Sequence, residues 1–247
     1  MRTLVFDIGN TAVKYGCFEA NGLQETAAGL TLEQMPATVE RLRPDHVLVA
    51  SVAEPTAAWA ARLQPLLKGR VLEFGPATTR LPIRNAYASP RTLGADRLAA
   101  AVGAAWLRPQ HDTLIVDAGT AIKCDWVEGG HTFRGGSIAP GLRMRFEALH
   151  KLTGRLPLVD MPAAVATPLD LIGTDTPSAI RSGVLNGAAA EVNGLIEQYQ
   201  ALSPRLAVVL AGGDAPFFQP RLKGHIFVIP ELVLLGLHRI LVHNVEN

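Results

Sequence analysis

Residues 4–11 read LVFDIGNT, and residues 114–121 read LIVDAGTA. In each copy an apolar run ends in an aspartate, Asp7 or Asp117, and a glycine and a threonine follow it. Short apolar runs rich in β-branched residues and bounded by glycine are typical of buried strands. The repeat therefore predicts two similar halves, each led by a strand that ends in a glycine turn.

The residues after the first turn, 12–20, are β-branched and aromatic with rough alternation, so they are predicted to continue as a strand. In Rossmann and P-loop folds the glycines instead lead straight into a helix, whose amino terminus holds the phosphate. Here the glycines are expected at the tip of a β-hairpin. This pattern argues against both of those folds.

Strand and helix signals then alternate along the chain, which predicts an α/β fold of two halves, residues 1–112 and 113–247. Residues 75–93 contain proline and threonine and are predicted as a long loop. Helices are predicted at 32–42, 57–67, 94–106, 141–150, 176–202 and from 231, and strands at 3–8, 12–20, 46–51, 71–74, within 111–121, and at 122–128, 132–138, 206–210 and 226–229.

The composition limits the classes of function. The 247 residues carry 23 basic and 22 acidic side chains, which gives no electrostatic basis for binding nucleic acid or an anionic membrane. Cys17 and Cys124 are too few and too far apart for a disulfide framework or a zinc site, and are predicted to be buried. With neither a signal peptide nor an uninterrupted apolar span, the protein is expected to be cytoplasmic.

The two glycine turns have a common chemical meaning. Glycine lets backbone N–H groups approach a phosphate, threonine adds a hydroxyl donor, and an aspartate at a strand end can hold a cation. A single turn of this kind also occurs as an ordinary connection. Two of them, facing each other across a cleft between the halves, would hold the phosphates of ATP for phosphoryl transfer.

A third glycine turn, AGGD at 211–214, follows another β-branched run. Its open backbone could lie against the purine or ribose of a nucleotide. An ordinary strand-to-helix turn with Gly213 as the cap is an equally good interpretation of this segment alone.

Six motifs occur in order: DIGNT, GADR with a tyrosine upstream, DAGTA, GGSIAPGL, GTDTPSAIRSG and AGGDA. This order resembles the type III pantothenate kinase family of the actin, Hsp70 and sugar-kinase superfamily, from Asp7 to the final PELVLLGL. The resemblance implies two ribonuclease H-like halves and ATP-dependent phosphorylation of pantothenate, the first step of coenzyme A synthesis. It also implies a homodimer, a divalent cation such as Mg²⁺ with ATP, and a monovalent cation, K⁺ or NH₄⁺.

The resemblance also assigns roles to matching residues. Asp96 would be the general base, Asp117 a ligand of the monovalent cation, and Asp7 a ligand of the divalent cation, directly or through water. The implied ATP-binding residues are Asp7, Ile8, Gly9, Asn10, Thr11, Ala12, Val13, Lys14 and Thr120, and the implied pantothenate-binding residues are Tyr87, Gly94, Ala95, Asp96, Arg97 and Thr176.

The chemistry of Asp96 and Arg97 supports that assignment independently. Pantothenate presents a primary alcohol, which needs a base within hydrogen-bond reach, and a carboxylate, which needs a cation. From the residues alone, a helix-capping Asp96 with a solvated Arg97 is an open alternative. The chain departs from the family at Ile122, Lys123 and Cys124, which are expected to alter the local surface more than the chemistry.

Small residues recur at helical spacing at Gly183, Gly187, Ala190 and Gly194, which favours close helix packing between the halves or across a dimer interface. Arg143 and Arg145 are expected to be solvated. Two alternatives to a pantothenate kinase remain: a superfamily phosphatase or other small-molecule kinase, and a non-catalytic regulator that keeps the fold.

Overall fold

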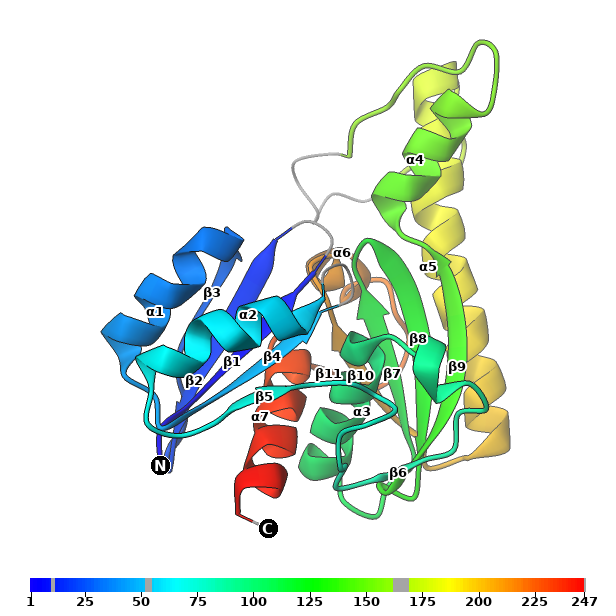
Figure 1. Ribbon diagram of the computed structural model, residues 1–247. Helices are drawn as coiled ribbons and strands as arrows, with labels where there is room; N and C mark the ends of the chain where they lie inside the picture. The colour runs from blue at the N-terminus through cyan, green and yellow to red at the C-terminus, as the bar shows by residue number, and fades with distance from the viewer. Residues whose placement is uncertain (10–11, 52–54, 162–168, 247) are drawn as a thin grey trace. The chain divides into compact units, whose positions relative to one another are not determined.

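The computed structural model describes residues 1–9, 12–51, 55–161 and 169–246 (Figure 1). Its contacts divide the chain into two compact units. Unit 1 comprises Met1–Gln110, Val127–Arg134 and Glu231–Asn247, and unit 2 comprises His111–Trp126 and Gly135–Pro230. The halves expected from the sequence, residues 1–112 and 113–247, and the cleft between them stay predictions.

Unit 1 is built on a five-stranded sheet in the order β3-β2-β1-β4-β5. Its first three strands form an antiparallel meander, and the other two run parallel to β1. The strands are β1 (Thr3–Ile8), β2 (Val13–Glu19), β3 (Gly22–Leu30), β4 (His46–Ser51) and β5 (Val71–Glu73).

Helices cover both faces of this sheet. Alternate residues of β1, such as Leu4 and Phe6, pack in one core with α1 (Met35–Leu42) and α2 (Thr56–Leu63). The opposite face meets α7 (Leu232–Val245), whose His238 hydrogen-bonds Thr3 at 2.8 Å and stacks on Phe18. Short 3-10 helices occur at Leu32–Gln34, Gln64–Leu66 and Pro90–Thr92.

Two glycines allow α7 to pack closely against α3 (Ala95–Leu107), which also belongs to unit 1. A Cβ at Gly236 would lie 1.7 Å from the carbonyl oxygen of Ala99, and one at Gly103 would lie 2.5 Å from that of Leu232. No side chain fits at either position, so the two helix backbones are in direct contact. The start of α3 is thereby held by the last helix of the chain.

The second sheet has the order β11-β10-β7-β8-β9-β6, and its segment β9-β8-β7-β10-β11 repeats the order of the first sheet. This repetition agrees with the two similar ribonuclease H-like halves expected from the sequence. Its strands are β6 (Arg84–Asn85), β7 (Thr113–Ala118), β8 (Ala121–Glu128), β9 (Thr132–Pro140), β10 (Ala207–Ala211) and β11 (Ile226–Val228).

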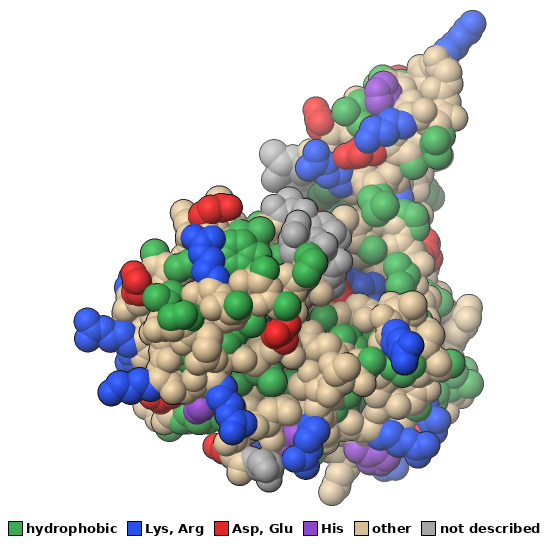
Figure 2. Space-filling model, viewed as in Figure 1, with side chains coloured by type: hydrophobic (Ala, Val, Ile, Leu, Met, Phe, Trp, Pro, Cys, Tyr) green, Lys and Arg blue, Asp and Glu red, His purple; other side chains and the backbone are tan. Residues whose placement is uncertain are grey.

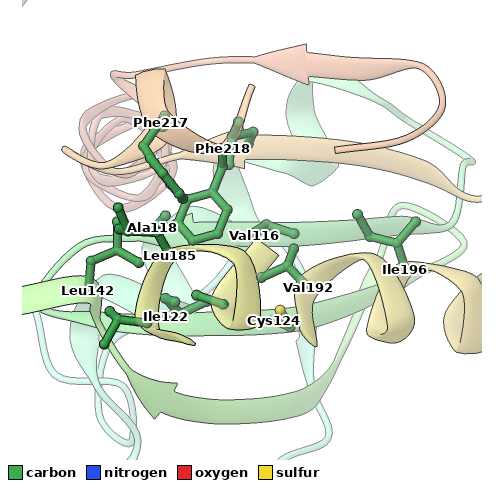
Figure 3. Close-up of a cluster of buried hydrophobic side chains, with 14 of the residues drawn as sticks. Val116, Ala118, Ile122, Cys124, Leu142, Leu185, Val192, Ile196, Phe217 and Phe218 are labelled. Carbon is green, nitrogen blue, oxygen red and sulfur yellow. The ribbon is translucent and has the colours of Figure 1, made fainter. Parts of the chain in front are cut away.

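One face of this sheet packs against the long helix α5 (Thr176–Leu202) and against α4 (Leu142–Lys151) and α6 (Ala215–Phe218). Figure 3 shows Leu185 and Val192 of α5 beside Val116 and Cys124 of the strands. Burial raises the pKa of the Cys124 thiol to about 12, and Cys17 is also buried, as predicted.

Most predicted elements are confirmed, and the bounds of β1, β4 and α5 are those expected. Strand β3 was missed, and the predicted loop 75–93 contains the short strand β6. Among the described residues, no helix combines the length and the apolarity needed to cross a membrane. Basic and acidic side chains are interspersed on the face shown in Figure 2.

Candidate functional site

The first glycine turn joins β1 to β2 in unit 1. Buried Ile8 and Val13 are register partners and fix the two ends of the turn, and the Gly9 amide donates to the Ala12 carbonyl at 3.2 Å. The predicted ATP-binding residues Asn10 and Thr11 lie outside the described residues. The antiparallel register of β1 with β2 agrees with the predicted β-hairpin.

Asp7 and Lys14 are directly opposite each other in the β1–β2 register. Opposite residues of an antiparallel pair project from the same face of the sheet. Asp7 is half-buried at the end of its strand, and Lys14 is exposed. The first turn therefore presents a carboxylate and an ammonium group side by side, one suited to a metal ion and the other to a phosphate.

The second glycine turn joins β7 to β8 in unit 2. Gly119 donates to the carbonyl of Ala121 at 3.1 Å, and Thr120 is exposed, where its hydroxyl can reach a ligand. Gly141, the N-cap of α4, supports the turn by donating to the Thr120 carbonyl at 3.1 Å. The GGSIAPGL motif thus supports the second loop through its last glycine.

The third turn packs against the second. Asp214 donates its amide to the carbonyl of Ala118 at 2.9 Å, and a Cβ at Gly212 would lie 2.1 Å from the same oxygen. Gly212 has φ +91°, a backbone conformation that favours glycine. The strand-to-helix turn is confirmed, but Asp214 rather than Gly213 is the N-cap of α6. Its contact with a nucleoside stays a prediction.

Asp117 has a partner that the sequence reasoning did not anticipate. Lys123 Nζ lies 2.7 Å from Asp117 Oδ2, and the two side chains are only 15% and 13% exposed. Lys123 was expected to alter the surface more than the chemistry, but its largely buried ammonium contacts the predicted cation ligand directly. Cys124, the next residue, is buried in the core.

The GADR motif forms the start of α3 in unit 1. Gly94 is the N-cap, and Asp96 lies in the first turn of the helix, half-buried. Asp96 is therefore not the capping residue, which removes that alternative. A Cβ at Gly94 would lie 2.5 Å from Asp96 Oδ1, so the carboxylate lies over the glycine, and Gly94 leaves it the space.

Arg97 is buried, with 5% of its surface exposed, so it is not a solvated partner of Asp96. Its guanidinium carbon lies 5.4 Å from the centroid of the Tyr87 ring and 6.0 Å from that of Phe133. Cation–π contact of this kind stabilises a desolvated arginine. The structure thus brings predicted Tyr87 and Arg97 together and adds Phe133, which the sequence reasoning missed.

Thr176, another predicted substrate contact, is exposed at the first position of α5, after the capping box of Asp175 and Ser178. Its role stays a prediction. Arg143 is exposed, but Arg145 pairs with Glu191 of α5 at 2.8 Å and is largely buried, contrary to expectation.

Among the described residues, no three His, Cys, Asp or Glu side chains cluster as a metal site. Single carboxylates such as Asp7 suit an ion whose other ligands are water and phosphate oxygens, as is usual for Mg²⁺.

Comparison with known proteins identifies the family. Residues 3–198 match the family model of type III pantothenate kinase. A type III pantothenate kinase of Cytophaga hutchinsonii is 43% identical over 98% of this chain and 99% of its own. Two solved structures share the fold: a conserved putative Baf family transcriptional activator from Campylobacter jejuni (20% identity, TM-score 0.63, 99% and 100% coverage) and a putative N-acetylmannosamine kinase from Listeria monocytogenes (17%, 0.61, 100% of both chains).

Proposed function

Because the chain belongs to the type III pantothenate kinase family, we propose that it transfers the terminal phosphoryl group of ATP to pantothenate. The product is 4′-phosphopantothenate, and the reaction is the first step of coenzyme A synthesis. The observation that carries the proposal is the GADR start of α3, where a half-buried carboxylate precedes a buried arginine that contacts two aromatic rings.

These residues match the two ends of pantothenate. Asp96 is the general base that accepts the proton of the primary alcohol as the alcohol oxygen attacks the γ-phosphorus of ATP and ADP leaves. Arg97 supplies the cation for the pantothenate carboxylate, and its cation–π contacts with Tyr87 and Phe133 restrict the position of the guanidinium group. A base and a cation on consecutive residues of one helix turn are kept at a fixed spacing.

The first and second glycine turns bind ATP in this proposal. Backbone N–H groups of the turns, the Lys14 ammonium and the Thr120 hydroxyl donate to phosphate oxygens. Asp7 would hold the Mg²⁺ that accompanies ATP. When bound, this ion neutralises negative charge on the phosphates.

A free monovalent cation fits the structure less well. The expected ligand, Asp117, is already paired with the Lys123 ammonium at 2.7 Å. A K⁺ or NH₄⁺ ion at this carboxylate would have to displace that group, so no step of the proposed reaction depends on such an ion.

We further propose that the enzyme is a cytoplasmic homodimer. The small-residue stripe of α5 supports this assembly, because Gly183, Gly187 and Ala190 are exposed and a Cβ at either glycine would meet nothing within 4 Å. A smooth, uncovered helix face permits close approach of a second helix. Sedimentation at working concentration tests the dimer, and a 26.3 kDa species would contradict it.

The activity is tested by incubating the protein with ATP, Mg²⁺ and pantothenate and measuring the product by mass spectrometry. A coupled ATPase assay with and without pantothenate separates the alternatives. Turnover that needs pantothenate supports the proposal. Turnover without it indicates a phosphatase, which transfers the phosphoryl group to water. No turnover indicates a kinase for another acceptor or a regulator.

A further inference from the structure

We propose that the ammonium group of Lys123 is a built-in monovalent cation of the second glycine turn, so that catalysis needs neither K⁺ nor NH₄⁺. The inference concerns the ion pair between Lys123 and Asp117, both of which belong to unit 2. It rests on the proposed kinase activity only where turnover is the measured quantity.

The geometry is that of an occupied cation site. Lys123 Nζ lies 2.7 Å from Asp117 Oδ2, within the range of a charge-assisted hydrogen bond, and neither side chain is more than 15% exposed. The other oxygen, Oδ1, faces the backbone of the third turn, since a Cβ at Gly212 would lie 2.6 Å from it. Both carboxylate oxygens therefore already face parts of the chain.

The strand keeps the ammonium in place. In β8, Ile122 and Cys124 belong to the core beneath α5, and both are labelled in Figure 3. Side chains alternate along a strand, so Lys123 projects from the opposite face, as Asp117 does between Val116 and Ala118 of β7. A tethered cation has a high local concentration at its partner, and a free ion entering beside it would be repelled by its charge.

The internal repeat shows the same pairing of residue types in the first turn. Residues 7–14 read DIGNTAVK and residues 117–123 read DAGTAIK, which differ in length by one position in the turn. Lys14 is the register partner of Asp7, and Lys123 is the ion-pair partner of Asp117. The second lysine thus occupies the equivalent place in the repeat, on the strand that returns from the glycine turn.

The first test compares pantothenate phosphorylation in NaCl, KCl and NH₄Cl at equal ionic strength. Wild-type rates should agree within about twofold, the scale of residual salt effects on exposed charges. Lys123→Ala should be slower in NaCl by about tenfold or more, because Asp117 is left unpaired, and should recover in KCl or NH₄Cl. Lys123→Met, which keeps the stem and fills the space, should be slow in all three salts.

Lys151→Ala is the matched control, because Lys151 is also ion-paired, to Glu147 at 2.8 Å, but lies exposed on α4. It should behave as the wild type in every salt. A wild-type enzyme about tenfold slower in NaCl than in KCl would overturn the inference, and so would wild-type rates for Lys123→Ala in NaCl.

The second test does not depend on turnover. Crystals soaked in Tl⁺ should show no anomalous peak at Asp117 in the wild type and a peak there in Lys123→Ala. A Tl⁺ peak on Asp117 in the wild type would contradict the inference. If no salt supports product formation, the proposed function fails, while this binding measurement still decides the role of Lys123.

Discussion

The amide of Gly141 donates a 3.1 Å hydrogen bond to the carbonyl oxygen of Thr120, and a Cβ at Gly141 would lie 2.4 Å from that oxygen. The N-cap residue of α4 and the tip of the second glycine turn are thus in backbone contact. The position of the turn depends on the absence of a side chain at residue 141.

Gly141→Ala should therefore displace the second turn. The neighbouring atoms are backbone, including the Gly119 carbonyl at 2.2 Å, and cannot move as a side chain could. We expect a loss of about 1–3 kcal/mol in the free energy of unfolding and a raised KM for ATP. Urea unfolding and ATP titration measure both. Gly154→Ala, where a Cβ meets nothing within 4 Å, should leave KM unchanged.

Gly94→Ala should impair catalysis more than stability. The new Cβ would lie 2.5 Å from Asp96 Oδ1, which is the end of a movable side chain, so the carboxylate is pushed aside while the helix persists. We expect a lower kcat for pantothenate, with the free energy of unfolding changed by less than about 1 kcal/mol. Gly154→Ala, at an exposed position where a Cβ meets nothing within 4 Å, should keep the wild-type kcat. Equal kcat values for the two variants would show that displacing the Asp96 carboxylate is harmless.

Asp96→Asn should lower kcat by about 10²–10⁴-fold, the usual contribution of a positioned base, because the amide keeps the size of the side chain but not its basicity. ATP binding, measured by calorimetry, should persist.

Asp7→Asn provides the contrast for that variant. It removes the proposed Mg²⁺ ligand, so added Mg²⁺ should partly restore its rate, whereas the rate of Asp96→Asn should not respond. If Asp96→Asn keeps the wild-type kcat, Asp96 is not the base.

His238 should make stability depend on pH. Burial, and secondarily the charge of Arg239, lower the pKa of His238 to about 4 from its usual 6.5. The folded protein therefore disfavours the protonated ring, and the unfolded chain binds more protons between these values. The neutral His238 ring therefore contributes to the free energy of unfolding fully above pH 6.5. This contribution, about 1–3 kcal/mol in total, is lost as the pH falls towards 4.

Urea unfolding at pH 7.5 and pH 5 measures this effect. His238→Gln, which can still hydrogen-bond Thr3, should lose less stability between the two pH values than the wild type does. His225→Gln, at an exposed position, should lose as much as the wild type. An equal loss in His238→Gln and the wild type would exclude His238 as the source.

The sequence predicted the hairpins and the long helices because their signals are local. The apolar run of Leu4 to Ile8 and the 27-residue α5 carry their periodicity within one element. Strand β3 was not predicted because its sequence, GLQETAAGL, is rich in residues that are rare in strands. The strand lies at the edge of the sheet and is half exposed, so it lacks the apolar run of a buried strand.

The contacts of Phe133 with Arg97 and of Lys123 with Asp117 were not predicted for a different reason, because they join residues of different elements. Arg97 belongs to α3, Tyr87 follows β6 and Phe133 belongs to β9. The pairing of Asn85 with Phe133 brings the two aromatic residues together. The Lys123–Asp117 ion pair also depends on strand register. The local signal for this pair is the lysine that ends each copy of the longer repeat, DIGNTAVK and DAGTAIK.

The contact of α7 with α3 bears on how the chain folds during synthesis. A ribosome releases α3 early, but the helix that fits its Gly103 emerges only after all of unit 2. Until then the α7-facing side of β1 and the glycine face of α3 lack their partner. We expect the nascent amino-terminal segment to remain protease-sensitive and dependent on chaperones until residues 232–245 leave the exit tunnel. The helix that carries Asp96, the proposed general base, would then acquire its final support last.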